Sequence, residues 1–314
     1  MYIGIDLGGT NIAAGLVMAD GKIIAKDSVP TLPQRGWKYV VNDMADLTKR
    51  ITADAGYEMS DVKAIGIGSP GTIDTDNGVV VFAANIGMEK TPVAAELGKY
   101  LGIPIHMEND ANAAAYGEYK VCGHDIDNFV FITLGTGVGG GIIIDRKIYR
   151  GFNSAGGEIG HTTLISGGEE CTCGRRGCYE AYASVTALRR QTQKKAQEVQ
   201  DSAMNDWIQK YGGVSGRTAF ECAAMGDSAA KEVRDKYIEY VAEGIVNVVN
   251  IFQPELVAIG GGISKEGDVI LGPLRRHVDK YDFNKFMPKT EIQIAKLFND
   301  AGIIGAALAA KDSI

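Results

Sequence analysis

Residues 129–141 read FVFITLGTGVGGG, a short apolar run that ends in a cluster of glycines. Residues 2–10, YIGIDLGGT, have the same layout near the start of the chain. A further apolar stretch follows each run, and turn residues come next, at 20–21 and at 145–146. Both copies predict a strand, a glycine turn, a strand, a tight turn and a strand. We infer an internal duplication that aligns Asp6 with Thr133, Gly8 with Gly135 and Gly9 with Thr136.

The two glycine turns are candidate phosphate-binding sites, because successive backbone N–H groups in such a turn attract an anion. Asp6, at the end of the first expected strand, could hold Mg²⁺ beside a phosphate. Two such turns facing each other would clamp a polyphosphate between two domains, whereas a plain glycine hairpin is the alternative for each. A dinucleotide-binding GxGxxG fingerprint is disfavoured, because a β-run rather than a helix follows the glycines.

Residues 158–180, EIGHTTLISGGEECTCGRRGCYE, concentrate potential metal ligands. Three sulfurs and one imidazole form a standard tetrahedral set for structural Zn²⁺. The alternatives are a disulfide or free surface thiols, and an odd total of five cysteines argues against a disulfide framework. The predicted zinc ligands are His161, Cys171, Cys173 and Cys178.

Two acidic residues flank this predicted metal segment. Glu158 lies three residues before His161, and Glu180 lies two residues after the last cysteine. Rigidly held carboxylates suit the binding of a polyol, because paired acceptors can take two adjacent hydroxyl groups. Solvated surface charges are the alternative reading of both residues.

Length and composition fit a globular protein of about two domains. The chain has 314 residues, 45% of them hydrophobic and 23% charged. A net charge of -7 disfavours nucleic acid as the main partner, since phosphate backbones require a basic surface. No apolar run is long enough to span a membrane. The first residues form no signal-peptide pattern, so we expect a cytoplasmic protein.

Several polar residues follow expected strands, where α/β proteins bind ligands. Asn109 and Asp110 lie at a strand-to-helix junction, where they could simply cap the helix. Alternatively, a carboxylate there could accept a proton from a substrate hydroxyl. Asn85 could donate to a hydroxyl or belong to a structural turn. Glycines 260–262 would let adenine approach the backbone, or they form only a tight turn.

The remaining periodicities predict an alternating α/β chain. We expect Thr91 to cap a helix at 91–101 and Asp300 to cap the final helix. Further helices are expected at 37–55, 184–199, 218–225, 229–252, 268–281 and 301–310, and further strands at 62–68, 103–107, 255–259 and 291–295.

Taken together, these motifs resemble the ROK family of bacterial sugar kinases, within the actin/hexokinase-like ATPase superfamily, and most closely its glucokinases. The resemblance runs along the whole chain, and its most selective part is the cysteine segment with the glutamate that follows it. It is carried by DLGGT at 6–10, END at 108–110, LGTGVGGG at 134–141, EIGH at 158–161, CTCGRRGC at 171–178 and GGGI at 260–263.

The resemblance implies an α/β, duplicated actin-like (ribonuclease H-like) ATPase fold, with two domains and a cleft between them. The last helix would return to the N-terminal domain, so we expect domains at 1–117 plus 300–314 and at 118–299. The zinc would be structural, and Mg²⁺ would accompany ATP. Sugar binding is expected at Gly71, Asn85, Asn109, Asp110, Glu158, His161 and Glu180. Nucleotide binding is expected at Asp6, Gly8, Gly9, Thr10, Asn11, Thr133, Gly135, Thr136, Gly137, Gly261 and Gly262.

The implied reaction is phosphorylation of glucose at its 6-hydroxyl by ATP, with Asp110 as general base. Kinases for mannose, fructose, N-acetylglucosamine or N-acetylmannosamine are the first alternative. A non-catalytic sugar sensor and a zinc-containing dinucleotide oxidoreductase are further alternatives. Repressors of the family carry a DNA-binding segment before the first strand, which we do not expect here, because that strand begins at Tyr2. The expected partners are the sugar, ATP and further copies of the chain in a dimer or tetramer.

Overall fold

The computed structural model describes all residues, 1–314, and the chain forms two compact units. The first unit consists of Met1–Asp127, Gly141–Gly157 and Lys296–Ile314, and the second of Asn128–Gly140 and Glu158–Ala295. The two units are defined by the contacts within each. The domain bounds expected from the sequence, 1–117 plus 300–314 and 118–299, stay a prediction. No helix combines the length and the apolar character that crossing a membrane requires.

The sheet of the first unit has the strand order β3-β2-β1-β4-β8. Its first three strands are antiparallel neighbours, and β1, β4 and β8 run parallel. A small antiparallel sheet, β5-β6-β7, follows β4 in the chain. The bounds are β1 Tyr2–Leu7, β2 Asn11–Val17, β3 Ile23–Pro30, β4 Ala64–Ser69, β5 Thr72–Asp74, β6 Val79–Ala83, β7 Met88–Thr91 and β8 Ile105–Asn109.

The second large sheet repeats this order as β11-β10-β9-β12-β13, and β12 runs parallel to both β9 and β13. Asp6 on β1 pairs with Gly68 on β4, and at the equivalent point Thr133 on β9 pairs with Gly260 on β12. The predicted duplication and its alignment are therefore confirmed. The bounds are β9 Phe129–Leu134, β10 Val138–Ile144, β11 Lys147–Ile148, β12 Leu256–Gly260 and β13 Glu291–Ile294.

Strand β1 divides its side chains between two faces, as the period of two in a strand requires. Ile3, Ile5 and Leu7 enter the large core of the first unit, which α1 (Trp37–Asp54) and α2 (Val93–Leu101) cover. On the other face, Tyr2 packs against α10 (Ala301–Asp312). Asp6 projects on that same face, at the carboxyl end of the strand.

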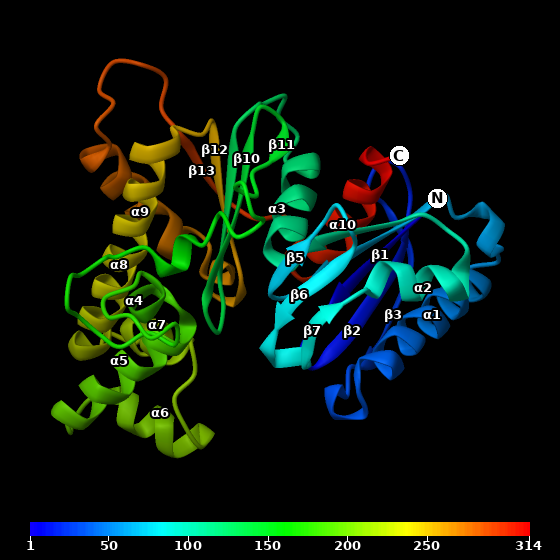
Figure 1. Ribbon diagram of the computed structural model, residues 1–314. Coiled ribbons are helices and arrows are strands. Elements are labelled where there is room, and N and C mark those ends of the chain that lie inside the picture. The colour runs from blue at the N-terminus through cyan, green and yellow to red at the C-terminus, as the bar shows by residue number, and fades with distance from the viewer. The chain divides into compact units, whose positions relative to one another are not determined.

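Helix α10 lies unusually close to its neighbours because glycines line its contacts. A Cβ atom at Gly66 of β4 would lie 1.8 Å from the Ala306 carbonyl oxygen. Between α10 and α3 (Asp110–Val121), a Cβ at Gly305 would lie 1.7 Å from the Ala113 carbonyl oxygen. Figure 1 shows α10, in red, beside α3 within this unit. The expected return of the last helix to the N-terminal part of the chain is confirmed.

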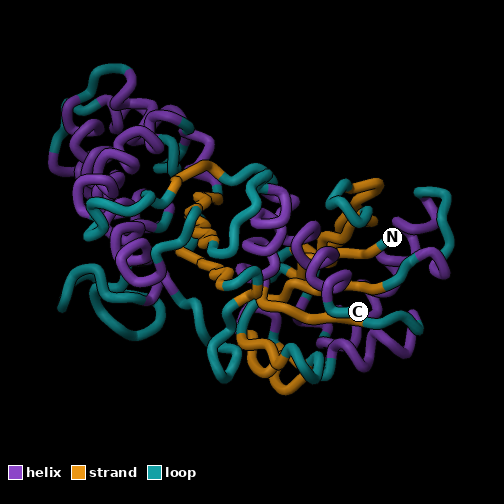
Figure 2. The backbone as a smooth tube through the Cα atoms, turned by 90° about the horizontal axis from the view of Figure 1, so that it is seen from above, coloured by secondary structure: helices purple, strands orange, loops and turns teal.

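The second unit is rich in helices. The longest, α8, contacts α4, α5, α7 and α9. Figure 2 shows helices of this unit gathered together, and both chain termini close together in the first unit. The bounds are α4 Glu180–Ala183, α5 Val185–Glu198, α6 Ala203–Tyr211, α7 Thr218–Ala224, α8 Ser228–Phe252 and α9 Asp268–Tyr281.

Two local expectations are wrong, and one helix was missed. Thr91 ends strand β7, and its hydroxyl donates to the Glu89 carbonyl oxygen, so α2 begins only after Pro92. Asp300 occupies the position before α10 but makes no capping bond, because its carboxylate pairs with Lys26 at 2.7 Å. Helix α6 was not expected, since it buries only Met204. The other expected elements are present, with their ends shifted by a few residues.

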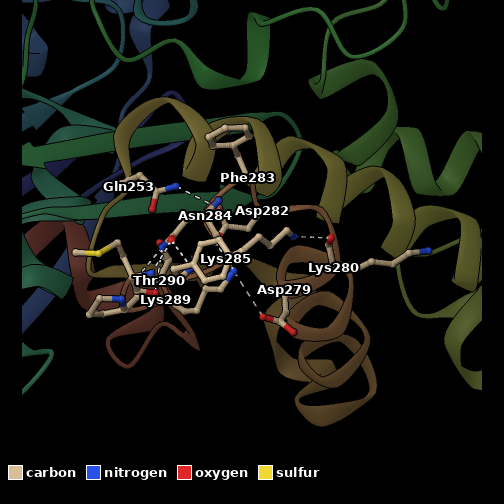
Figure 3. Close-up of polar contacts among 12 residues, drawn as sticks. Gln253, Asp279, Lys280, Asp282, Phe283, Asn284, Lys285, Lys289 and Thr290 are labelled. Atoms are coloured by element: carbon tan, nitrogen blue, oxygen red, sulfur yellow. Dashed lines mark hydrogen bonds and ion pairs between the residues drawn. The ribbon is translucent and has the colours of Figure 1, made fainter.

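A polar network organises the loop between α9 and β13. The buried Asp282 carboxylate accepts from the Asn284 backbone N–H at 2.9 Å, from Lys289 Nζ at 2.9 Å and from Gln253 Nε2 at 3.2 Å (Figure 3). Burial alone would raise the pKa of Asp282, but the bonds from Lys289 and Asn284 outweigh it and hold that pKa below its usual range. The loop therefore keeps a fixed shape, although Phe283 is exposed.

We predict that Gly305→Ala lowers the free energy of unfolding by about 1–3 kcal/mol, because the added methyl group forces α10 away from α3. Gly98→Ala is the matched control, since the nearest atom to its Cβ would be 4.0 Å away and alanine favours the helix. Urea denaturation followed by circular dichroism gives both values. A Gly305→Ala protein as stable as the parent would contradict this account of the packing.

Candidate functional site

The four predicted metal ligands come together. Their ligand atoms lie within 4.8 Å of one another, with Nδ1 of His161 3.5 Å from Sγ of Cys171 and the sulfurs of Cys173 and Cys178 3.7 Å apart. Tetrahedral zinc places two sulfurs about 3.8 Å apart and a nitrogen and a sulfur about 3.5 Å apart. Both distances fit, and none of the five cysteines forms a disulfide. The donor set therefore suits a zinc ion.

Tight turns shape the backbone of this cluster. Gly174 and Gly177 both adopt positive φ, at 85° and 83°, and a Cβ at Gly177 would lie 1.7 Å from the Ile165 carbonyl oxygen. Only glycine fits such a conformation and approach without strain. Directly after Cys178, the fully buried Tyr179 donates from its hydroxyl to the Val241 carbonyl oxygen of α8 at 2.9 Å. The cluster is thus anchored on the longest helix of the second unit.

The thiols of the cluster differ in acidity. Burial raises the pKa of the Cys178 thiol to about 12, and a hydrogen bond from the Arg175 backbone N–H lowers the pKa of Cys173. Because a metal binds thiolates, Cys178 must lose its proton when an ion enters the cluster. Acid would therefore weaken the binding of a metal ion at this cluster.

Glu180 connects the cluster with the second glycine turn. One carboxylate oxygen accepts from the Val138 backbone N–H at 3.0 Å, and the other accepts from the Thr172 hydroxyl at 3.1 Å. A Cβ at Gly137 would lie 2.3 Å from the first oxygen, so the turn needs glycine beside this carboxylate. Glu180 is therefore not a solvated surface charge. Glu158 is exposed, and its carbonyl oxygen accepts from the His161 backbone N–H at 3.1 Å.

Asn109 and Asp110 begin α3 in the first unit. Asn109 Oδ1 accepts from the backbone N–H groups of Ala111 and Asn112, at 2.9 and 3.2 Å, so the capping alternative is correct for Asn109. Its Nδ2 donates to the Gly71 carbonyl oxygen at 3.1 Å. One oxygen of Asp110 accepts from the Ala111 N–H at 2.8 Å. The Asp110 backbone N–H and the Asn109 side chain also form hydrogen bonds with this carboxylate.

Two carboxylates of the first unit interact electrostatically. Burial raises the pKa of Asp110, and burial together with the charge of Asp110 raises the pKa of Asp6 to about 6. A Cβ at Gly302, in the first turn of α10, would lie 2.9 Å from the Asp6 carboxyl carbon. Asp6 therefore lies beside the positive end of that helix, and a bound cation would favour its ionised form.

The first glycine turn has the expected hairpin form, with the Gly8 N–H donating to the Asn11 carbonyl oxygen at 2.9 Å. Thr10 and Asn11 are exposed. A Cβ at Gly9 would lie 3.4 Å from Nδ2 of Asn85, so these two predicted site residues are neighbours. Gly71 has a φ of 88°, and a Cβ there would lie 2.1 Å from the Phe82 carbonyl oxygen. Glycine is thus required at that position.

The second glycine turn is closed by the Gly135 N–H, which donates to the Gly137 carbonyl oxygen at 3.0 Å. Strand β10 follows it, which confirms that the context differs from a dinucleotide fingerprint. Thr133 ends β9 immediately before the turn, and Thr136 is exposed at its tip. At the third glycine cluster, a Cβ at Gly261 would lie 2.1 Å from the Leu134 carbonyl oxygen, whereas Gly262 has open space around it.

Sequence reasoning missed one pair of residues beside Asp110. Glu108 is 2% exposed and forms an ion pair with Arg150, which lies just after β11. The available signal was a glutamate inside the apolar end of a strand, which predicts a buried charge with a partner. The sequence could not identify that partner.

Comparison with known proteins gives a consistent picture. The model of the ROK family matches residues 2–313. The glucokinase of Halalkalibacterium halodurans is 38% identical over 306 residues, which cover 97% of this chain and 93% of that protein. The glucokinase of Thermotoga maritima is 37% identical over 314 residues, which cover 99% of this chain and 98% of that protein.

Among solved structures, a ROK family glucokinase from Streptomyces griseus, in complex with glucose and AMPPNP, superposes with a TM-score of 0.82. It is 34% identical, and the match covers 99% of each chain. The ROK hexokinase of Thermus thermophilus has a TM-score of 0.80 at 33% identity, over 99% of this chain and 98% of that chain.

We predict that Asp6→Asn stabilises the protein at pH 8 by on the order of 2–3 kcal/mol. A carboxyl whose folded pKa lies above its unfolded value opposes folding once it ionises, so the gain should shrink as pH falls from about 6 to 4. Asp201→Asn is the control, because that side chain is exposed. Urea unfolding at several pH values measures the effect. A gain that does not depend on pH would contradict the raised pKa.

Proposed function

This chain belongs to the ROK family and is a sugar kinase with the two-domain actin-like ATPase fold, and we propose that it phosphorylates glucose at the 6-hydroxyl with ATP. The observation that carries the choice of glucose is the full-length similarity to glucokinases, at 37–38% identity. The chemistry proposed for each residue rests on the geometry of its own unit.

Asp110 is the proposed general base. Its carboxyl is partly buried, one oxygen accepts from the Ala111 N–H at 2.8 Å, and burial raises its pKa despite this and other hydrogen bonds. A raised pKa brings a carboxylate closer to the working pH, where a base is most effective. We assign Asn109, Gly71 and Asn85 to the sugar as well. Because Oδ1 of Asn109 caps α3 and Nδ2 already donates to the Gly71 carbonyl oxygen and to Asp110, a sugar hydroxyl bound by this side chain would replace one of these Nδ2 bonds.

The glycine turns are the proposed phosphate sites, with backbone N–H groups as donors. Mg²⁺ bound with ATP would neutralise charge on the transferred group, and Asp6 is the group of this chain that we assign to that ion. We assign adenine to the third cluster, where open space surrounds Gly262. The nucleotide residues proposed are Asp6, Gly8, Gly9, Thr10, Asn11, Thr133, Gly135, Thr136, Gly137, Gly261 and Gly262.

A structural zinc ion is the proposed occupant of the cluster at His161, Cys171, Cys173 and Cys178. Since Nδ1 of His161 faces Cys171, its Nε2 is left for a sugar hydroxyl. Glu158 and Glu180 are the proposed acceptors on either side of the cluster. The zinc would hold these three side chains in fixed directions rather than take part in the transfer.

A kinase for an N-acetylated hexose is the second candidate. The N-acetylmannosamine kinase of Yersinia pseudotuberculosis is 31% identical over 313 residues, which cover 99% of both proteins. The two candidates differ at the sugar C2 substituent, so they share the base, the phosphate turns and the zinc cluster.

An ADP-release assay with MgATP tests the function. The sugars would be glucose, mannose, fructose, N-acetylglucosamine and N-acetylmannosamine. We expect the highest kcat/KM with glucose. A preference for an N-acetylated sugar would favour the second candidate, and no turnover on any sugar would refute a kinase for these hexoses.

We predict that Asp110→Asn lowers kcat by about 10²–10⁴, because the amide keeps the shape of the side chain but cannot accept the proton. Circular dichroism should show an intact fold. Asp20→Asn, which changes an exposed carboxylate of the same unit, should keep the parental kcat. An Asp110→Asn enzyme with nearly normal kcat would remove Asp110 from the mechanism.

We predict about one zinc ion per chain in the purified protein, measured by plasma mass spectrometry. Cys173→Ser should lose most of the metal and unfold at lower temperature, because zinc binding contributes folding free energy. Cys222→Ser is the control, since that thiol is buried elsewhere in the unit. Zinc-free parental protein from a zinc-supplemented preparation without chelators would refute the assignment.

A further inference from the structure

Glu108 is a buried charge that the proposed chemistry does not use. It precedes Asn109 at the end of β8, and 2% of the residue is exposed. Burying a carboxylate is strongly unfavourable unless charged and polar partners replace water. A carboxylate at this position, two residues before the proposed base, therefore needs an explanation.

The Glu108 carboxylate is fully engaged. One oxygen accepts from the Asn109 backbone N–H at 3.0 Å and from Asn112 Nδ2 at 3.1 Å. The other accepts from Nε of Arg150 at 2.7 Å and also contacts Nη2 of that guanidinium. Bonds between charged groups of this kind are short and directional. The carboxylate thus connects the arginine with both ends of the first turn of α3.

This turn does not need Glu108 as a helix cap, since the Asn109 side chain already supplies that function. Glu108 adds two constraints of a different kind. Glu108 holds the peptide group of Asn109, and with it the direction of the Asn109 side chain, whose Nδ2 donates to Gly71. Glu108 also holds the side chain of Asn112. Asp110 lies between these two fixed points.

Arg150 is itself held in place. Its carbonyl oxygen accepts from the Gly156 backbone N–H at 2.9 Å. The backbone N–H of the preceding residue, Tyr149, donates to the Ile142 carbonyl oxygen at 2.8 Å. Its guanidinium contacts Glu108 through two different nitrogens. Only arginine presents such a rigid fork, whereas lysine offers a single flexible ammonium group.

We propose that Glu108 and Arg150 are a positioning pair, which holds the first turn of α3 so that Asp110 faces the reacting hydroxyl. This inference rests on the proposed function, because it assumes that Asp110 is the base. A misplacement of a catalytic group by about 1 Å can reduce a rate by about 10²-fold. Loss of the pair should therefore reduce kcat far more than it weakens ATP binding.

The first test is Glu108→Gln, with kcat and KM measured per folded protein. We expect kcat to fall by about 10- to 100-fold, while KM for MgATP changes by less than about twofold. Arg150→Lys should also lower kcat, because lysine cannot contact the Glu108 carboxylate through two nitrogens. A Glu108→Gln enzyme with parental kcat would overturn the inference.

A double variant separates positioning from stability. Replacing both partners, in Glu108→Gln with Arg150→Met, removes the unpaired buried charge and should recover most of the lost thermal stability. We expect kcat to stay at least about tenfold below the parent, because the constraint on α3 is still missing. Recovery of the parental kcat together with stability would show a purely structural role and overturn the inference.

Glu118→Gln is the matched control. Glu118 is also 2% exposed, lies near the other end of α3, and accepts from the backbone N–H groups of Lys296 and Leu297. Its loss should lower stability but leave kcat per folded protein unchanged. If kcat falls as much as in Glu108→Gln, loss of any buried glutamate beside or within α3 affects the rate, and the inference is refuted.

The outcomes distinguish this inference from the proposed function. If the parent prefers another hexose, the choice of glucose fails, and the same variants are compared on that sugar. If the parent phosphorylates glucose but the variants match it, only the positioning role fails. If the parent phosphorylates no sugar, the proposed function and this inference both fail.

Discussion

The close approach of α10 to β1, β4 and α3 is the constraint on which the first unit depends. Glycines at positions 4, 66, 117 and 305 remove the side chains that would otherwise separate these elements. The start of α10 consequently lies beside the carboxyl end of β1, where Asp6 projects. The same packing brings the start of α3 close enough for the charge of Asp110 to raise the pKa of Asp6.

This arrangement opposes stability, because two carboxylates near each other in a buried place resist ionisation. A protein selected for stability alone would place apolar or hydroxyl side chains there. The same features suit a kinase, in which a cation offsets one carboxylate and a sugar hydroxyl engages the other. In the second unit, a metal bound by the proposed ligands would give rigidity to a segment that consists mostly of glycines and exposed polar residues.

The sequence was most informative where a short motif is itself the structural unit. The glycine turns and the strand that follows each are local patterns and were predicted correctly, and the four predicted metal ligands lie together, as expected. Asn109 shows a limit of sequence reasoning, because its two possible roles, helix cap and sugar ligand, do not exclude each other. The structure shows the cap, with Nδ2 donating to the Gly71 carbonyl oxygen. The prediction that Thr91 caps α2 was wrong, because Thr91 is the last residue of strand β7 and the helix begins after it.

Contacts between side chains far apart in the chain could not be predicted from the sequence. Glu108 and Arg150 are 42 residues apart, and only the return of the chain after β11 brings the guanidinium to the end of β8. Helix α6 was missed for a related reason, since its surface is mostly polar and its position depends on Ser202 and Asp227, whose side chains meet across 25 residues. Periodicity detects burial along one element, and it contains no information on which distant charge completes a buried one.

The most direct test of the central claim is the position of the phosphoryl group in the product. Glucose labelled with ¹³C at carbon 6 would be incubated with the parental protein and MgATP, and the product examined by ¹³C and ³¹P nuclear magnetic resonance. A single phosphomonoester whose phosphorus couples to the labelled carbon is the predicted result. A phosphoryl group on any other hydroxyl, or unchanged glucose beside ADP and free phosphate, would contradict it.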